Sequence, residues 1–121
     1  MINNETEFHE WLNNQLNLEI PSDIIAFNIN IYQSPFFIEI VGSTEFDKQD
    51  EDWACNEDWI PKERRIEVSE SIYGSSWEDA QVNISNMAKS FLKSNLSNVE
   101  KIKNAAGFAV GFVDGNLEYI K

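Results

Sequence analysis

Carboxylates and tryptophans are the residues of this chain whose types and spacing could support a specific chemistry. They concentrate in residues 45–59, which read EFDKQDEDWACNEDW and which we call the acidic segment. A single cation, Lys48, and the only cysteine, Cys55, lie among them. The seven carboxylates and two tryptophans of the segment are Glu45, Asp47, Asp50, Glu51, Asp52, Glu57, Asp58, Trp53 and Trp59.

The acidic segment has two interpretations. Carboxylates at this density repel one another, so the segment weakens the fold that carries it. In the first interpretation it is a solvated loop whose tryptophans fold back onto the core. In the second it is an acidic, aromatic surface for a basic partner, because tryptophan is enriched at interface hot spots and carboxylates complement a positive target. The run KERR at residues 62–65 is placed to pair with some of the acids.

Nucleophilic catalysis is not indicated. It requires a serine or cysteine beside a base, and the chain has one histidine, His9, and one cysteine, Cys55. These are expected on separate elements, and no nucleophile elbow, phosphate-binding loop or dinucleotide fingerprint is present. We therefore predict no catalytic residues and a protein that is not an enzyme.

Metal binding is the alternative that carboxylates raise. One cysteine and one histidine do not make a zinc site. An EF-hand loop beginning at Asp50 would have Ala54, Cys55 and Pro61 where an acid, a glycine and a glutamate are needed. We predict no metal and no cofactor. A small carboxylate-based domain or enzyme that binds a divalent metal through an irregular site remains the alternative.

Composition excludes other classes of function. The chain has 121 residues and a net charge of −12, from 21 acids and nine bases. That charge disfavours direct binding to nucleic acid or to an anionic membrane. The start, MINNETEFHEW, lacks the pattern of a signal peptide, and no stretch approaches the roughly 20 apolar residues of a membrane span. A lone cysteine cannot form an intramolecular disulfide, so we expect a cytoplasmic protein.

Two helices are predicted from apolar residues at helical spacing. The first covers residues 5–17, with Asn4 and Glu7 as a capping pair, and the second covers 77–94, with Ser75 and Glu78 or Ser76 and Asp79. Residues 94–105 are either a short helix or a polar loop. The expected buried faces are Phe8, Trp11, Leu12 and Leu16, and Trp77, Ala80, Ile84, Met87, Ala88 and Phe91.

Alternating apolar and polar residues predict strands. They occur at residues 24–33, with one wet face, at 36–42, at 66–68, and in the closing stretch from 108 to 120. Turns are expected at Ser34-Pro35 and Asp114-Gly115-Asn116, and Gly107 and Gly111 indicate a bulge or close packing against a helix. We predict one α+β domain over residues 1–121, with a mostly antiparallel sheet of about five strands and two main helices packed on one face.

The chain resembles the small acidic immunity proteins of bacterial polymorphic-toxin and contact-dependent growth inhibition systems. The resemblance rests on size, on FIEIVGSTEFD, on DEDWACNEDWIP, and on the long helix and closing FAVGFVDGNLEYI. It implies a protein that binds one cognate toxin domain and blocks it. Charge then favours a basic toxin, such as a nuclease, bound by the carboxylates and tryptophans of the acidic segment. A subunit of a larger assembly, with an exposed apolar patch away from the acids, is a third interpretation.

Overall fold

The computed structural model of the protein describes residues 1–33, 35–113 and 115–121. The predicted turn residues Ser34 and Asp114 lie outside the described residues. The elements along the chain are α1 (Glu5–Leu16), β1 (Ala26–Tyr32), β2 (Phe37–Ser43), the 3₁₀ helix η1 (Glu51–Cys55), β3 (Ile66–Glu67), α2 (Glu70–Tyr73), α3 (Trp77–Leu92), α4 (Val99–Lys103), β4 (Gly107–Phe112) and β5 (Glu118–Tyr119).

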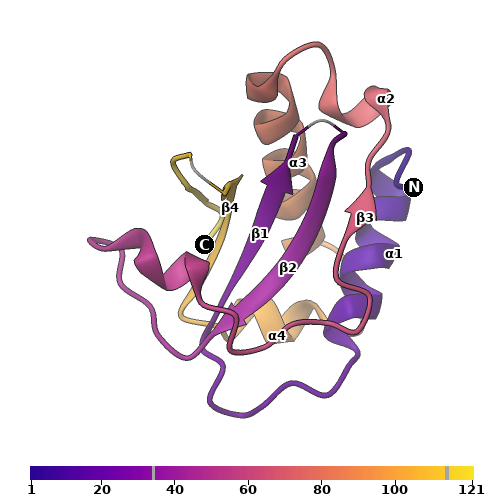
Figure 1. Ribbon diagram of the computed structural model, residues 1–121. Helices are drawn as coiled ribbons and strands as arrows, with labels where there is room; N and C mark the ends of the chain where they lie inside the picture. The colour runs from indigo at the N-terminus through magenta and orange to yellow at the C-terminus, as the bar shows by residue number, and fades with distance from the viewer. Residues whose placement is uncertain (34, 114) are drawn as a thin grey trace.

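The strands form one sheet with the order β3-β2-β1-β4-β5 (Figure 1). β1 and β4 are parallel, because the chain between β3 and β4 crosses the sheet through α3 and α4. The other pairs are antiparallel. The prediction of one α+β domain with a mostly antiparallel sheet of five strands and two main helices, α1 and α3, is confirmed.

Both main helices begin at the predicted caps. The Asn4 side chain accepts a hydrogen bond from the Glu7 amide at 2.9 Å, and the Ser76 hydroxyl accepts one from the Asp79 amide at 3.1 Å. These bonds satisfy backbone donors that the first helical turn leaves free. α2 and α4 are short. Residues 94–105 were expected to form either a short helix or a polar loop, and α4 shows that they include a helix.

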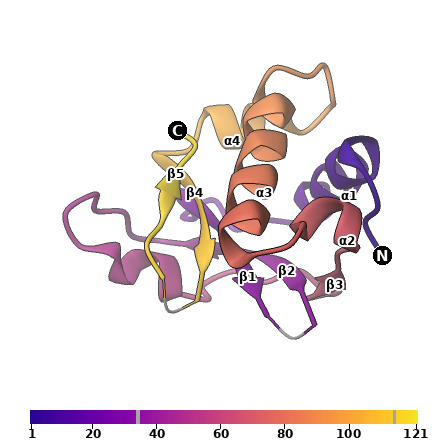
Figure 2. The same cartoon turned by 90° about the horizontal axis from the view of Figure 1, so that it is seen from above.

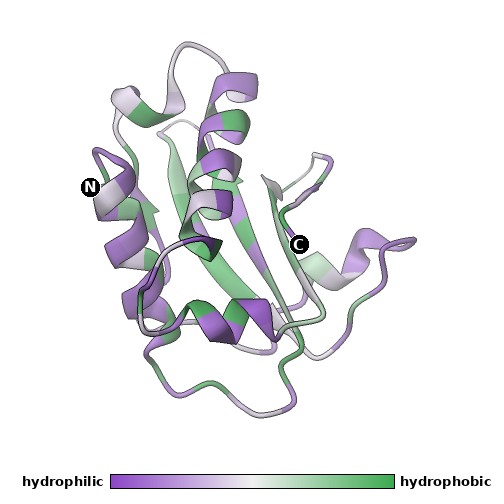
Figure 3. Ribbon diagram, turned by 180° about the vertical axis from the view of Figure 1, so that it is seen from behind, coloured by the Kyte–Doolittle hydropathy of each residue, from purple (hydrophilic) through white to green (hydrophobic). Residues whose placement is uncertain are grey.

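The main core lies between the helices and one face of the sheet, which we call the inner face (Figures 2 and 3). In β1 the alternation places Phe27, Ile29 and Ile31 on this face, beside Ile40 of β2 and Val110 of β4. All five side chains are nearly or fully buried. The opposite, outer face of the sheet carries the acidic segment.

Two predictions of burial are wrong. Trp77 was expected in the buried stripe of α3, but it is 52% exposed, because the first turn of that helix reaches past the core. Its ring packs edge-on against Phe112. The polar face of β1 was expected to be wet, but Asn28 is 1% exposed. The chain after β2 folds back over that face.

No helix among residues 1–33, 35–113 and 115–121 combines the length and the apolar character that crossing a membrane requires.

Candidate functional site

The acidic segment leaves the sheet after Ser43, the end of β2, and returns to it at Trp59 as a closed loop. Gly42 and Trp59 form an antiparallel bridge, with the Gly42 amide donating to the Trp59 carbonyl at 2.9 Å. At the neck of the loop, Thr44 donates its amide and its hydroxyl to one carboxylate oxygen of Asp58, at 2.8 and 2.9 Å. Figure 1 shows the loop projecting sideways from the sheet beyond β4.

Trp59 is part of the main core rather than the surface. Its side chain is 7% exposed and packs edge-on against Phe27, with ring centroids 5.9 Å apart. Its indole Nε1 donates to the carbonyl of Glu19 at 3.1 Å, which also satisfies the one polar group of the ring. Trp59 therefore fixes the end of the acidic segment and the chain that follows α1.

Trp53 anchors the middle of the segment on the outer face. It is 3% exposed and packs with Ala54 and Phe46 of the segment against Ala109 and Tyr119. The Trp53 and Phe46 rings meet edge-on at 5.1 Å. The second interpretation places both tryptophans on a binding surface, which requires them to be exposed, and neither is. The first interpretation of the segment, in which they fold back onto the core, is correct for them.

β4 provides the flat floor that this small second core needs. Its outer-face residues are Gly107, Ala109 and Gly111, all small. A Cβ at Gly107 would come within 2.1 Å of the Phe46 ring, and one at Gly111 within 3.0 Å of Leu117. The glycines were predicted to mark a bulge or close packing against a helix; the packing is close, but the partners are a loop phenylalanine and a leucine.

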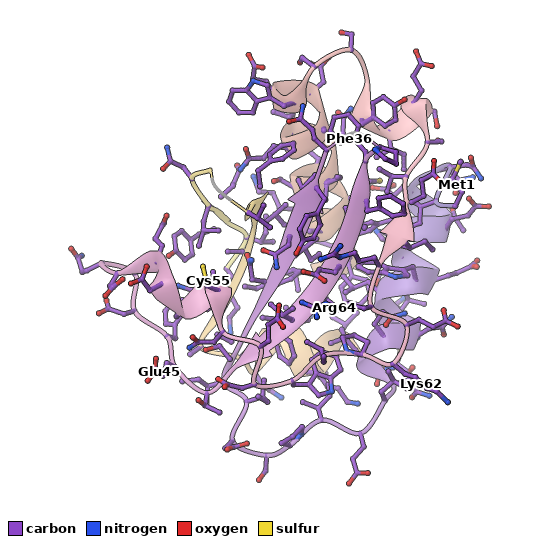
Figure 4. The ribbon with its side chains drawn as sticks, in the orientation of Figure 1. Met1, Phe36, Glu45, Cys55, Lys62 and Arg64 are labelled. Carbon is purple, nitrogen blue, oxygen red and sulfur yellow. The ribbon has the colours of Figure 1, made fainter. Side chains whose placement is uncertain are left out.

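The short helix η1 shapes the tip of the segment. The Asp50 carboxylate accepts a hydrogen bond from the Asp52 amide at 3.1 Å, and Asp47 does the same for Gln49 at 2.8 Å. Cys55 ends η1 and is exposed on the outer side of the molecule (Figure 4). His9 instead lies between α1 and α3, with its Nε2 3.2 Å from the Met87 carbonyl. A Cys55–His9 dyad is therefore excluded.

The seven carboxylates divide into two groups. Glu57 pairs with Arg64, and Asp58 closes the neck of the loop. No ion pair joins the remaining five to any residue that the structure describes; four of them are exposed and Glu51 is half-buried. They are Glu45, Asp47, Asp50, Glu51 and Asp52, and we call them the carboxylate tip.

Cations give the carboxylate tip little compensation. Lys48 lies over the Tyr119 ring, with its Nζ 5.5 Å from the ring centroid. In the KERR run, Arg64 forms an ion pair with Glu57 of the acidic segment. Both Arg64 and Arg65 also pair with Glu39, a buried acid of β2. KERR was expected to pair with some acids of the acidic segment. Among the ion pairs of the described residues, Glu57 with Arg64 is the one that fits this expectation.

Glu39 is the centre of a polar network that sequence reasoning missed. Its side chain is 0% exposed and accepts hydrogen bonds from Tyr32 Oη at 2.5 Å, Asn30 Nδ2 at 3.1 Å and Arg64 Nε at 2.9 Å. The Arg65 guanidinium covers the Tyr32 ring at 4.1 Å. Through Arg64 the network ties the acidic segment to β2 (Figure 4).

The charges of this network shift three pKa values. Burial opposes ionisation of Glu39, but the bonds from Tyr32, Arg64 and Asn30 outweigh it and hold the pKa of the carboxyl below its ordinary value. Burial, and then the bond to Glu39, raise the pKa of Tyr32. The bond to Glu39 raises the pKa of Arg64. Glu39 is therefore a carboxylate at neutral pH.

The carboxylate tip does not form a metal cage. Glu45, Asp47, Asp50 and Asp52 line a pocket of about 240 Å³ with the Phe46 and Trp53 rings at its base. Within the part of the chain that the structure describes, no three acidic, histidine or cysteine side chains converge as metal ligands would. The arrangement presents negative charge outward over an area, as a macromolecular partner requires.

Comparison of the chain with protein-family models, with curated proteins and with solved structures finds no match.

Proposed function

We propose that this chain is a cytoplasmic immunity protein, which binds and neutralises a cognate bacterial toxin domain through the carboxylate tip. The toxin domain is basic, and a nuclease fits best, because a cleft that holds phosphates is lined with positive charge. The observation that carries the proposal is the set of five carboxylates that form no ion pair among the residues that the structure describes, on a loop that the fold holds in one place.

Preorganisation supports a binding role. The neck hydrogen bonds between Thr44 and Asp58, and the burial of Trp53 and Trp59, order the loop before any partner arrives. A partner then loses less free energy to loop ordering than it would on a disordered acidic run. The tryptophans of the acidic segment thus act as internal supports, and its carboxylates face the partner.

Charge supports fast recognition. The chain has a net charge of −12, and the acidic segment, with seven carboxylates and one lysine, holds a net −6 of it. This charge attracts a positive surface over a distance of about one Debye length. Carboxylates that enter a nuclease cleft occupy positions meant for phosphate oxygens. Inhibition then follows from occupancy of the cleft, without any reaction on either protein.

The direct test uses the toxin domain encoded next to the gene. We expect binding by calorimetry at low salt, weaker binding as salt rises, and rescue of growth when both proteins are produced together. Absence of binding at low salt, together with absence of rescue, rejects the proposal.

Charge variants locate the surface. Asp47→Asn, Asp50→Asn and Asp52→Asn together remove three charges of the carboxylate tip and retain the side-chain oxygens that accept from Gln49 and Asp52. The control is Glu10→Gln, Glu63→Gln and Glu78→Gln, three exposed acids elsewhere on the molecule. We expect the first triple variant to weaken binding at least about tenfold and to flatten its salt dependence, and the control to do neither.

A second candidate function is a subunit of a larger assembly. The observation that favours it is the exposed Trp77, at the end of the sheet opposite the acidic segment, with Val82 52% and Val113 49% exposed on the neighbouring α3 and β4 regions. Light scattering across a concentration series tests it. An oligomer that Trp77→Ser dissociates supports it, and a monomer at all concentrations rejects self-assembly.

A further inference from the structure

An apolar cleft of about 890 Å³ opens beside the base of the acidic segment. One wall is the chain that joins α1 to β1, and the other is the end of α4 with the turn into β4. Figure 3 shows these segments together at one end of the molecule. The lining residues are mainly apolar: Leu18, Ile20, Ile24, Ile25, Phe27 and Ala106.

Hydrogen bonds between the two walls hold the cleft open at a fixed width. Lys101 Nζ donates to the Leu16 carbonyl at 2.5 Å, and the Ala106 amide donates to the Ile25 carbonyl at 2.7 Å. The Trp59 indole Nε1 donates to the Glu19 carbonyl and so fixes the first wall to the main core. The cleft is thus a preformed feature of the fold, as ligand and partner sites usually are.

Two apolar side chains at the mouth of the cleft remain partly exposed. Leu18 is 38% exposed and Ile25 is 39% exposed, although both belong to residue types that folding normally buries. Single exposed residues of this kind are ordinary, but these two flank the same cleft. A partner side chain placed between them would remove both from water.

The acidic segment borders this cleft directly. The Ile25 amide donates to the Ser43 carbonyl at 2.8 Å, just before the neck of the loop. On the other wall, Ala106 precedes Gly107, which the Phe46 ring covers. Glu19 is an exposed carboxylate in the lining, and Asp23, also exposed, lies between the lining residues Ser22 and Ile24. A partner on the carboxylate tip is therefore within reach of the cleft, and charge selects a basic one.

We infer that the cleft takes one bulky apolar side chain from a basic segment of the partner, whose flanking Lys or Arg residues face Glu19, Asp23 and the acidic segment. The inference rests on the proposed function and adds the anchor that the buried tryptophans do not supply. The carboxylates raise the association rate by attracting the partner from a distance, and the contact in the cleft lowers the dissociation rate.

A pair of peptides tests the cleft without the toxin. The first is acetyl-Lys-Gly-Lys-Trp-Lys-Gly-Lys-amide, and the second has Ala in place of Trp. Nuclear magnetic resonance titration of the labelled protein is expected to show the Trp peptide binding roughly tenfold more tightly. The shifted backbone amides should include those of Leu18, Ile25 and Ala106.

Two variants and a control make the result decisive. Ala106→Trp places a large ring in the cleft from an exposed position, and Leu18→Ser removes an apolar side chain from its mouth. Val82→Trp adds the same bulk on the exposed side of α3. We expect the preference for the Trp peptide to be lost in the first, reduced in the second and kept in the third. Equal binding of both peptides, or a preference that survives in Ala106→Trp, overturns the inference.

The toxin domain then separates the two proposals. If it binds the wild type and Ala106→Trp equally well, the cleft has no part in recognition, while the proposed function stands. If the peptides show the cleft preference but the toxin domain does not bind, the proposed function fails, and the cleft remains a binding site for a basic segment with an apolar anchor.

Discussion

Phe46 lies directly over Gly107: a Cβ at that glycine would stand 2.1 Å from Cε1 of the ring. Real Cβ atoms do not approach that closely, so the absence of a side chain at Gly107 is what allows Phe46 to dock on the outer face of the sheet. Gly107 of β4 thereby determines where the acidic segment, and with it the carboxylate tip, lies on the sheet.

Gly107→Ala is therefore expected to lower the free energy of unfolding by about 1–3 kcal/mol, the usual cost of overpacking. It should also displace the acidic segment and expose Trp53, which urea denaturation and acrylamide quenching of fluorescence would measure. Gly115→Ala is the control, because its Cβ would meet Phe112 at an ordinary 3.4 Å. An equal effect of both substitutions would contradict this account of docking.

Trp53 and Trp77 are expected to contribute differently to the stability of the fold. Trp53→Ala is expected to cost about 3 kcal/mol of unfolding free energy, since it removes the centre of the second core. Trp77→Ala is expected to cost less than about 1 kcal/mol, because Trp77 is 52% exposed. Relative to the wild type, Trp77→Phe should lose most of the tryptophan fluorescence that iodide can quench. Iodide quenching that persists in Trp77→Phe would mean that another tryptophan is exposed.

Periodicity was enough to predict the inner face of the fold. The stripes of α1 and α3 and the alternation in β1, β2 and β4 all face one core, and each main helix begins at a predicted cap. The failure at Trp77 has a physical reason. Helical spacing assigns a residue to a face, but it does not say whether the sheet extends far enough to cover that turn.

The candidate site was predictable in composition and not in geometry. Charge density identified the acidic segment, but which acids point outward depends on pairs far apart in sequence, such as Arg64 with Glu57 and Thr44 with Asp58. The Glu39 network could be anticipated only in part: once β1 and β2 pair as a hairpin, Asn30 lies opposite Glu39. Its closure by Arg64 and Arg65 follows from the path of the loop, which no periodicity encodes.

Glu39→Gln tests the network through pH. Since the pKa of Glu39 in the folded protein lies below its ordinary value of 4.5, its ionised form stabilises the fold above that pH, and this contribution is lost as pH falls through the lowered pKa. We expect the variant to lose about 2 kcal/mol at pH 7, and its difference from the wild type to shrink in more acidic solution.

Urea denaturation of both proteins between pH 7 and pH 3 measures this difference, and effects of the other carboxylates cancel in it. Glu63→Gln, at an exposed acid, is the control and should differ little from the wild type at any pH. A difference for Glu39→Gln that stays constant through the acid range would show that the charge of Glu39 does not contribute.

The carboxylate tip should cost the protein stability when no partner is bound. Asp47→Asn, Asp50→Asn and Asp52→Asn together remove three charges that repel their neighbours and keep the hydrogen bonds of the loop, so we expect a gain of roughly 0.5–1 kcal/mol at low salt. Added salt should raise the stability of the wild type more than that of the variant, because it screens the same repulsion. Thermal denaturation across a salt series measures both effects. If the variant is less stable than the wild type at low salt, the carboxylates hold the loop together, and their outward charge is not the free surface that binding requires.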